Sequence, residues 1–135
     1  MTNAELLELP VDILVPAAME NQITKDNVNK IKAKVIVEMA NGPTTPEADE
    51  ILKQNGVVVV PDVLANAGGV ATSYFEWVQN VKNEKWTEVE VFAKLEPLMI
   101  KAFDEVWETK EKYSIDLRTA AFVKAIERVA SKMKH

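Results

Sequence analysis

The amino-acid sequence predicts an α/β fold, in which about three parallel strands are followed by longer helices. Three short runs rich in Val and Ile alternate with segments of helical pattern. Near-continuous apolar runs of this kind are typical of parallel strands that are covered on both faces. Polar residues follow these runs, and open α/β sheets place their ligand-binding groups beyond the carboxyl ends of the strands. Together these observations indicate a partial doubly wound, Rossmann-like sheet with right-handed crossovers.

The predicted strands and their connections come first along the chain. The strands are expected at residues 11–15, 34–38 and 57–60. A short crossover helix or turn at residues 25–31 joins the first two strands, and a helix at residues 45–54 joins the second to the third. Thr45 is placed to cap this helix, and Pro46 is favourable as its first residue. The helix is expected to end at Gly56, a common left-handed stop.

The most informative stretch, residues 65–80, follows the third strand. The strand leads into Gly68 and Gly69, which open a helix expected at residues 67–81, and the apolar positions of that helix form one face. The two glycines let a ligand or another backbone come close, and Asn66 is a plausible N-cap. Free N–H groups at such a helix start favour an anionic ligand group. The alternative is a helix start that merely packs tightly.

Two longer helices are expected to close the chain and to serve structural packing. Thr87 begins a capping box at the start of the first of them. Pro97 lies inside its apolar pattern, where proline costs about 3 kcal/mol in an unbroken helix. We therefore expect a kink or break within residues 91–97 and a regular helix over residues 97–112. Asp116 is expected to cap the last helix, whose predicted buried face consists of Leu117, Ala121, Phe122, Ile126, Val129, Ala130 and Met133.

Composition restricts the classes of function. The net charge is −5 and there is no basic run, so nucleic-acid binding is not expected. The chain has no cysteine, and its single histidine is the last residue, His135, so neither a thiol nor a histidine is expected to act in catalysis or to bind a metal. No apolar run reaches membrane-spanning length and no signal-peptide pattern is present, so no membrane association and a cytoplasmic location are expected. Glu38, at a strand end, is expected to cap a helix or form a salt bridge.

Several ordered motifs resemble the glutamate dehydrogenase family. The motif ANGPTT at residues 40–45 and the motif ANAGGV at residues 65–70, followed by WVQN at residues 77–80, carry the resemblance. The motifs LVPAA at residues 14–18, ENQIT at residues 20–24 and DLRTAA at residues 116–121 match the same family in the same order. The likeness is greatest to the hexameric enzymes of thermophilic archaea and bacteria, and it covers essentially the whole chain.

The resemblance also implies that parts of the complete enzyme are missing. A complete enzyme is much longer and has an N-terminal substrate domain with a catalytic lysine and aspartate, and a glycine-rich fingerprint on its first cofactor-domain strand. This chain has four glycines and no G-x-G-x-x-G motif. Residues 1–135 are therefore expected to be the C-terminal part of the dinucleotide-binding domain, inactive alone. A truncated or remnant domain that folds and self-associates, or a subunit completed by a separate N-terminal chain, are the alternatives.

The family resemblance implies cofactor contacts at four positions. It implies that Ala17 or Ala18, after the first strand, contacts NAD or NADP, and that Asn41 lies near the nicotinamide ribose. Asn66 is implied to reach the nicotinamide amide or the substrate. Asn41 could instead serve only to hold the turn before Pro43. Binding of NAD or NADP is expected to be weak or absent in this chain, because the pyrophosphate normally rests on the missing glycine-rich helix start. The preference between the two cofactors is set in the missing half.

The family resemblance also implies a substrate contact on the helix after the glycine pair. Ser73 corresponds to the serine that hydrogen-bonds the side-chain carboxylate of L-glutamate or 2-oxoglutarate, and Val70 to the residue that packs on its methylenes. The two residues are three apart on a helix, so both can face one cleft. No residue of this chain is assigned a catalytic or metal-binding role. Because half a doubly wound sheet leaves the edge at residues 11–15 unpaired, a homo-oligomer is expected.

Overall fold

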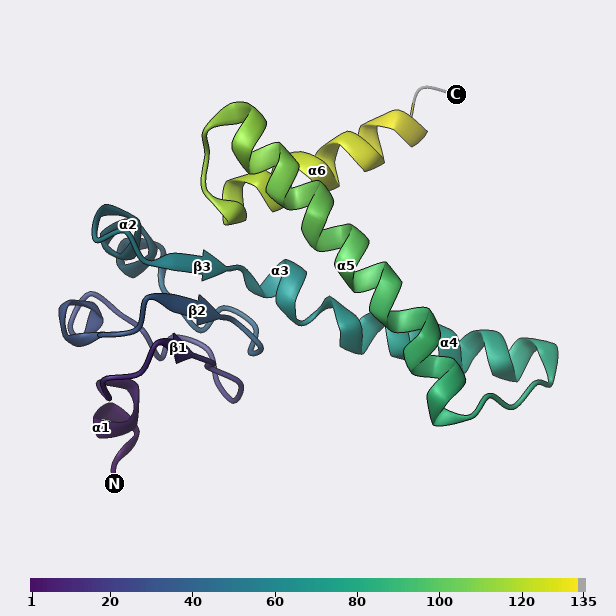
Figure 1. The fold of residues 1–135 in the computed structure, drawn as a ribbon, viewed down its shortest axis with the longest axis horizontal. Helices are drawn as coiled ribbons and strands as arrows, with labels where there is room; N and C mark the ends of the chain where they lie inside the picture. Colours follow the sequence, from purple (N-terminus) through teal and green to yellow (C-terminus); the bar gives the residue numbers. More distant parts are fainter. Residues whose placement is uncertain (134–135) are drawn as a thin grey trace.

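A computed structural model describes residues 1–133, and it contains a three-stranded parallel sheet that leads into an arm of long helices (Figure 1). The strands β1 (Ile13–Leu14), β2 (Val35–Val37) and β3 (Val58–Val60) lie in the order β1-β2-β3. Ile13 pairs with Val35, and Ile36 pairs with Val59. The predicted α/β class and parallel sheet are confirmed, although each strand is shorter than expected.

The segments before and between the strands form the core together with the sheet. Helix α1 (Asn3–Leu7) precedes β1, the short 3-10 helix η1 (Val28–Lys30) joins β1 to β2, and α2 (Pro46–Gln54) joins β2 to β3. The Thr45 side chain caps α2 by accepting from the Ala48 N–H, and Gly56 ends it with a φ of 74°. The core of this region consists of Leu7, Leu14, Ile23, Val28, Ala33, Ile36, Ala48 and Leu52.

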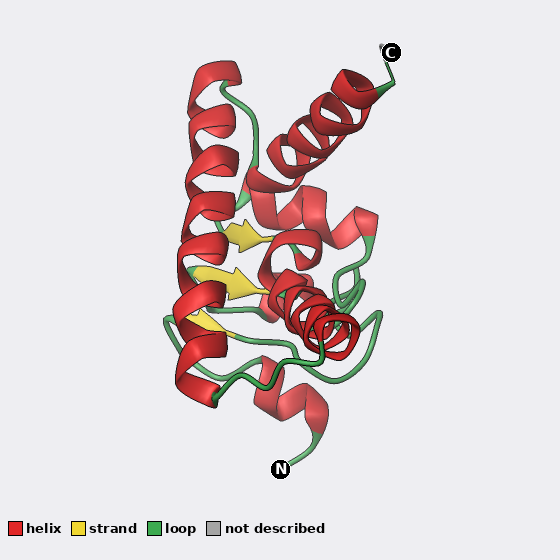
Figure 2. Cartoon of the chain, turned by 90° about the vertical axis from the view of Figure 1, so that its right-hand side faces the viewer, coloured by secondary structure: helices red, strands yellow, loops and turns green. Residues whose placement is uncertain are grey.

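The helical region begins directly after β3. A short helix, α3 (Asp62–Ala65), lies between β3 and α4 (Ala67–Lys82), so the glycine pair does not follow the strand directly. Helix α5 (Glu88–Tyr113) returns alongside α4, and α6 (Leu117–Lys132) packs on α5 near the sheet (Figures 1 and 2). The core of the helical region consists of Leu64, Val106, Leu117, Ala120 and Ala121.

The break expected within residues 91–97 is wrong, because α5 is one continuous helix from Glu88 to Tyr113, whereas a kink there stays a prediction. Pro97 and Ala93, the residue four positions earlier whose carbonyl loses its partner, are both exposed. Water can therefore satisfy that carbonyl, which lowers the cost of an internal proline. The two other helix-start predictions are confirmed, since Thr87 forms a capping box and Asp116 accepts from the Thr119 N–H.

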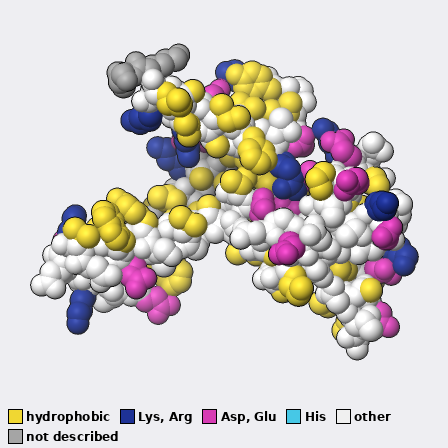
Figure 3. Space-filling view, turned by 180° about the vertical axis from the view of Figure 1, so that it is seen from behind, with side chains coloured by type: hydrophobic (Ala, Val, Ile, Leu, Met, Phe, Trp, Pro, Cys, Tyr) yellow, Lys and Arg dark blue, Asp and Glu magenta, His cyan; other side chains and the backbone are white. Residues whose placement is uncertain are grey.

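The predicted buried face of α6 is correct only at its start. Leu117 and Ala121 are buried, but the later members of the face, Phe122, Ala130 and the rest of the stripe, lie open to solvent. The apolar face of α4 is also exposed, with Val70 at 74% and Trp77 at 59%. Figure 3 shows hydrophobic side chains gathered along these helices. The pattern identified apolar faces correctly, but no element among residues 1–133 covers them.

Two predictions from composition concern membrane association and His135. Among residues 1–133, no helix is both long enough and apolar enough to cross a membrane. The prediction made for His135 concerns a residue outside the described range.

Candidate functional site

The loops that follow β1 and β2 are tied together at the carboxyl edge of the sheet. The carbonyl of Pro16 accepts hydrogen bonds from the Met39 N–H at 3.0 Å and from the Ala40 N–H at 2.9 Å. Ala17 and Ala18 come next and are exposed. Their small side chains leave the backbone accessible on this edge, where open α/β sheets bind their ligands.

Asn41 and Asn66 meet at the same edge, although they are 25 positions apart. The Asn66 Nδ2 donates to the Asn41 Oδ1 at 2.6 Å. Asn66 stands at the N-cap position of α4, but its side chain makes no capping hydrogen bond, so the predicted capping role is wrong. Within residues 1–133, the pair keeps the amide donor of Asn41 and the carbonyl acceptor of Asn66 without a hydrogen-bond partner.

A groove of about 740 Å³ opens beside this pair. Three of the predicted site residues, Asn41, Asn66 and Val70, line it, together with Val63, Tyr74 and Leu98. The groove thus combines two amide side chains with an apolar wall, a composition common in small-molecule sites. The fold brings these three predicted residues together from the loop after β2, the start of α4 and the first turn of α4.

The other predicted residues lie outside the groove lining. Ala17 and Ala18 are on the neighbouring loop after β1. Ser73 is exposed one turn beyond Val70, and its Oγ donates to the Gly69 carbonyl at 3.1 Å. A hydroxyl can rotate away from such an intrahelical bond to meet a ligand, so its present partner leaves the substrate role as a prediction.

The two glycines at the start of α4 have different surroundings. A Cβ added at Gly68 would lie 3.7 Å from the Met99 Sδ of α5, whereas one added at Gly69 would meet nothing within 4 Å. Gly68 therefore lies at a helix-packing contact. This agrees with the alternative interpretation of this stretch as a tightly packed helix start. Gly69 instead borders open space.

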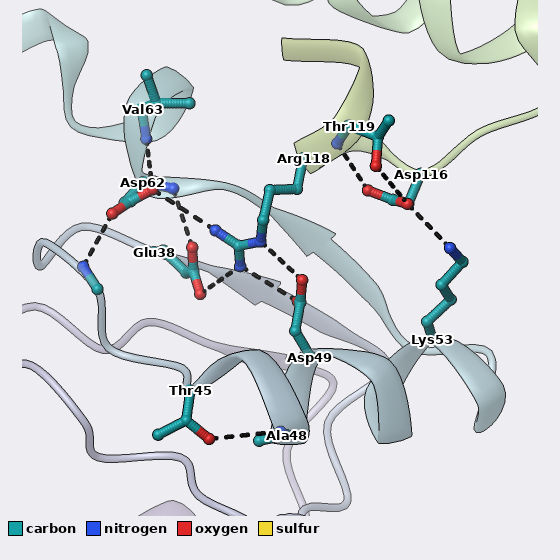
Figure 4. Close-up of polar contacts among 11 residues, drawn as sticks. Glu38, Thr45, Ala48, Asp49, Lys53, Asp62, Val63, Asp116, Arg118 and Thr119 are labelled. Carbon is teal, nitrogen blue, oxygen red and sulfur yellow. Dashed lines mark hydrogen bonds and ion pairs between the residues drawn. The ribbon is translucent and has the colours of Figure 1, made fainter. Parts of the chain in front are cut away.

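A cluster of charged side chains lies behind this edge of the sheet and joins α6 to the site loops (Figure 4). The guanidinium of Arg118 holds Asp49 with two hydrogen bonds, of 2.7 and 3.2 Å, and Glu38 with one of 2.9 Å. Glu38 is fully buried and its other oxygen accepts from the Asp62 N–H at 2.9 Å. Asp62 accepts from the Gly42 N–H at 2.8 Å and lies 3.6 Å from Arg118.

The electrostatics of this cluster keep the guanidinium charged. Burial lowers the pKa of Arg118, but hydrogen bonds to Asp49 and Glu38 outweigh that effect, so the pKa is raised. The prediction that Glu38 caps a helix or forms a salt bridge is confirmed by its ion pair with Arg118. Its second oxygen accepts from the first N–H of α3, although Pro61 is the N-cap residue of that helix. Sequence reasoning missed the cluster as a unit, because Asp49, Asp62 and Arg118 are far apart along the chain. The one indication of the cluster in the sequence was Glu38, a glutamate at the end of a buried strand.

A second cavity, of about 310 Å³, lies at the other end of β3. It is lined by Lys53, Lys110, Asp116 and neighbouring residues. Both lysines are already paired, Lys53 with Asp116 at 3.1 Å and Lys110 with Glu111. None of the predicted site residues lies there, so the groove beside Asn41 is the stronger candidate site.

The sequence profile of the glutamate/leucine/phenylalanine/valine dehydrogenase family matches residues 1–135. The chain belongs to this dehydrogenase family. A glutamate dehydrogenase of Thermotoga maritima is 60% identical over 130 residues, covering 96% of this chain and 31% of that protein. An NAD-specific glutamate dehydrogenase of Staphylococcus aureus is 53% identical over 135 residues, covering 100% of this chain and 33% of that protein. The resemblance to glutamate dehydrogenases is confirmed, and the chain spans about a third of the length of these curated relatives.

Solved structures of the dehydrogenase family share the fold. A glutamate dehydrogenase from Peptoniphilus asaccharolyticus is 47% identical with a TM-score of 0.84, covering 89% of this chain and 30% of that one. A glutamate dehydrogenase from Thermus thermophilus, described as hetero-hexameric and leucine-bound, is 35% identical with a TM-score of 0.90, covering 95% of this chain and 31% of that one. The three-stranded sheet and its helices therefore have the arrangement seen in these dehydrogenases.

Proposed function

We propose that this chain supplies half of the cofactor cleft of an NAD(P)-dependent glutamate dehydrogenase, which converts L-glutamate to 2-oxoglutarate and ammonia. The observation that carries the proposal is the Asn41–Asn66 pair, joined at 2.6 Å at the carboxyl edge of the sheet and open to the groove. Family membership and the glutamate dehydrogenases among the relatives support it. We also propose that residues 1–135 form the C-terminal part of the dinucleotide-binding domain.

The residues present fit the nicotinamide end of a dinucleotide. The pair offers one amide donor and one carbonyl acceptor beside an apolar wall, which complements a carboxamide on a flat ring. A bound NAD or NADP would supply the acceptor for the hydride that leaves the α-carbon of glutamate. Asn41 and Asn66 orient the ring and its ribose, and Ala17 and Ala18 allow the cofactor to lie against the backbone.

The substrate side of the proposal involves α4. Val70 packs on the methylenes of glutamate, and the Ser73 hydroxyl turns from the Gly69 carbonyl to donate to the side-chain carboxylate. Holding that carboxylate fixes the α-carbon against the ring, and such positioning contributes to rate even without a proton transfer. Asp62 also lines the groove, but it is bonded to the Gly42 N–H and is assigned no proton transfer in this scheme. The lysine and aspartate of the family would therefore come from elsewhere.

A chimeric enzyme tests the proposal. The matching 130-residue segment of the Thermotoga maritima relative is replaced by this chain, and glutamate-dependent reduction of NAD and NADP is followed by absorbance. We expect activity in the chimera and none in the isolated chain. Ser73→Ala in the chimera should raise the KM for glutamate by about tenfold, the loss of one hydrogen bond to a charged group. Glu76→Gln, an exposed change on α4, is the control.

Two outcomes would contradict the proposal. Activity of the isolated chain that is lost on Ser73→Ala would show that the chain is complete as an enzyme. A folded chimera without activity would instead favour a second candidate, a non-catalytic domain that self-associates. The exposed apolar faces of α4 and α6 support that candidate.

A further inference from the structure

The two asparagines of the groove are held in place by a carboxylate and not by their own segments alone. Asn41 lies on an exposed loop, and the next residue, Gly42, donates its N–H to the Asp62 Oδ2 at 2.8 Å. Asp62 is the first residue of α3, and the four-residue helix ends next to Asn66. Asp62 therefore contacts the loop of one asparagine and begins the helix that leads to the other.

Asp62 is in turn fixed from behind the sheet. Its backbone N–H donates to the Glu38 Oε2 at 2.9 Å, and its Oδ1 lies 3.6 Å from the Arg118 Nη1. The Glu38 Oε1 accepts from the Arg118 Nη2 at 2.9 Å (Figure 4). Glu38 is fully buried, so it can hold Asp62 in this orientation only while a cation neutralises it.

We propose that Arg118 is a positioning residue for the candidate site, acting through Glu38 and Asp62 to set the Asn41–Asn66 pair. The role rests on the proposed function of that pair in binding NAD(P). Arg118 lies 80 positions after Glu38, on α6, so the last helix of the chain contributes to the groove without lining it.

The shape of the guanidinium suits this task. Arg118 uses Nη2 for Glu38, Nη1 toward Asp62, and Nε with Nη2 for Asp49. A lysine ammonium is a single point donor on a flexible stem and cannot reproduce this planar fork. Arg118→Lys should therefore keep the charge but loosen the asparagine pair.

The proposal assigns different roles to the two aspartates that contact the guanidinium of Arg118. Asp49 and Asp62 both contact Arg118, but only Asp62 is bonded to Gly42. If Arg118 acts only as a stability anchor, Asp49→Ala and Asp62→Ala should affect the asparagine pair alike. If Arg118 acts through Asp62, both Arg118→Lys and Asp62→Ala should disturb the pair, and Asp49→Ala should not.

Nuclear magnetic resonance of the isolated chain provides the first test. The side-chain amide of Asn66 reports the 2.6 Å bond to Asn41 through its chemical shift and its exchange with water. We expect Asp62→Ala to move this signal to the position of a free amide and to speed exchange by about tenfold or more. Arg118→Lys should shift the signal in the same direction, with Asp49→Ala close to the parent chain. An unmoved signal in Asp62→Ala or in Arg118→Lys, or an equal change in Asp49→Ala, would overturn the proposal.

The chimera described above provides the second test. Asp62→Ala and Arg118→Lys should raise the KM for NAD by about tenfold with a smaller change in kcat, and Asp49→Ala should leave that KM near the parent value. An equal fall in kcat for all three variants would overturn the positioning role. An inactive parent chimera would count against the proposed function alone, because the resonance of Asn66 still decides the positioning.

Discussion

The sheet region, residues 1–60, and the helical region, residues 62–132, differ in how far their apolar side chains are exposed. Ile23 and Ile36 of the sheet region are fully buried, whereas Val70 and Trp77 of α4 are mostly exposed. Both regions have the patterning of buried elements. The sheet region therefore contains partners for its inward-facing side chains, although Ile13 and Val15 at its β1 edge stay about half exposed. By contrast, α4 and most of α6 lack a covering partner among residues 1–133 along most of their apolar faces.

The largest expected difference between the two regions is in the free energy of unfolding lost when a large apolar side chain is removed. Ile36, in the central strand, has no exposed surface, so Ile36→Ala should lower the free energy of unfolding by about 2–5 kcal/mol through lost burial and a cavity. Trp77→Ala on α4 is the matched change, and it should alter the same free energy of the monomer by less than about 0.5 kcal/mol. Urea unfolding of both variants makes the measurement. Equal losses would mean that α4 is buried within one chain.

This difference could not be predicted from the residues alone, because periodicity reports which face of a helix is apolar and not what covers it. Phe122 was expected to be buried on this ground and is exposed. The strands and the caps at Thr45, Thr87 and Asp116 could be predicted, because they depend on neighbouring residues. The break expected at Pro97 was wrong because exposure of the affected carbonyl is not visible in a local pattern.

The candidate site was likewise predictable only in part. Asn41, Asn66 and Val70 were found through the family motifs, and the structure places all three on one groove. The bond between the two asparagines and the link from Arg118 to Gly42 connect segments far apart along the chain. Such pairings depend on how the sheet and α6 pack together, and no spacing rule in a single sequence reports them.

Self-association tests whether the exposed apolar face of α4 is covered by a second copy of the chain. The edge strand β1 is only two residues long, so the exposed face of α4 offers a larger surface for a homo-oligomer than the unpaired sheet edge does. We expect the chain to dimerise at tens of micromolar, and Trp77→Ser to weaken dimerisation by about 2 kcal/mol, as for a central aromatic contact. Sedimentation equilibrium measures both, with Glu76→Gln as the control. A stable monomer of the parent chain would contradict this prediction.

The smallest expected effect lies at the joint between the two regions, where Asp116 at the start of α6 meets Lys53 of α2 at 3.1 Å. Burial raises the pKa of Asp116, but hydrogen bonds from Thr119 and Lys53 outweigh it, so the pKa lies below its ordinary value of 3.8. A carboxyl with a lower pKa in the folded chain stabilises the fold above its unfolded pKa and loses that contribution as the pH falls.

Asp116→Asn should therefore be less stable than the parent chain at pH 7, by less than about 1 kcal/mol for a partly exposed pair. The difference should shrink as the pH falls below 3.8, because protonation removes the same charge from the parent chain. Asp12→Asn removes one partner of the Asp12–Lys34 pair, which is about four-fifths exposed, and should change stability at pH 7 less. Urea unfolding across this pH range checks the prediction. A difference between parent and Asp116→Asn that grows toward low pH would contradict the sign of the pKa shift.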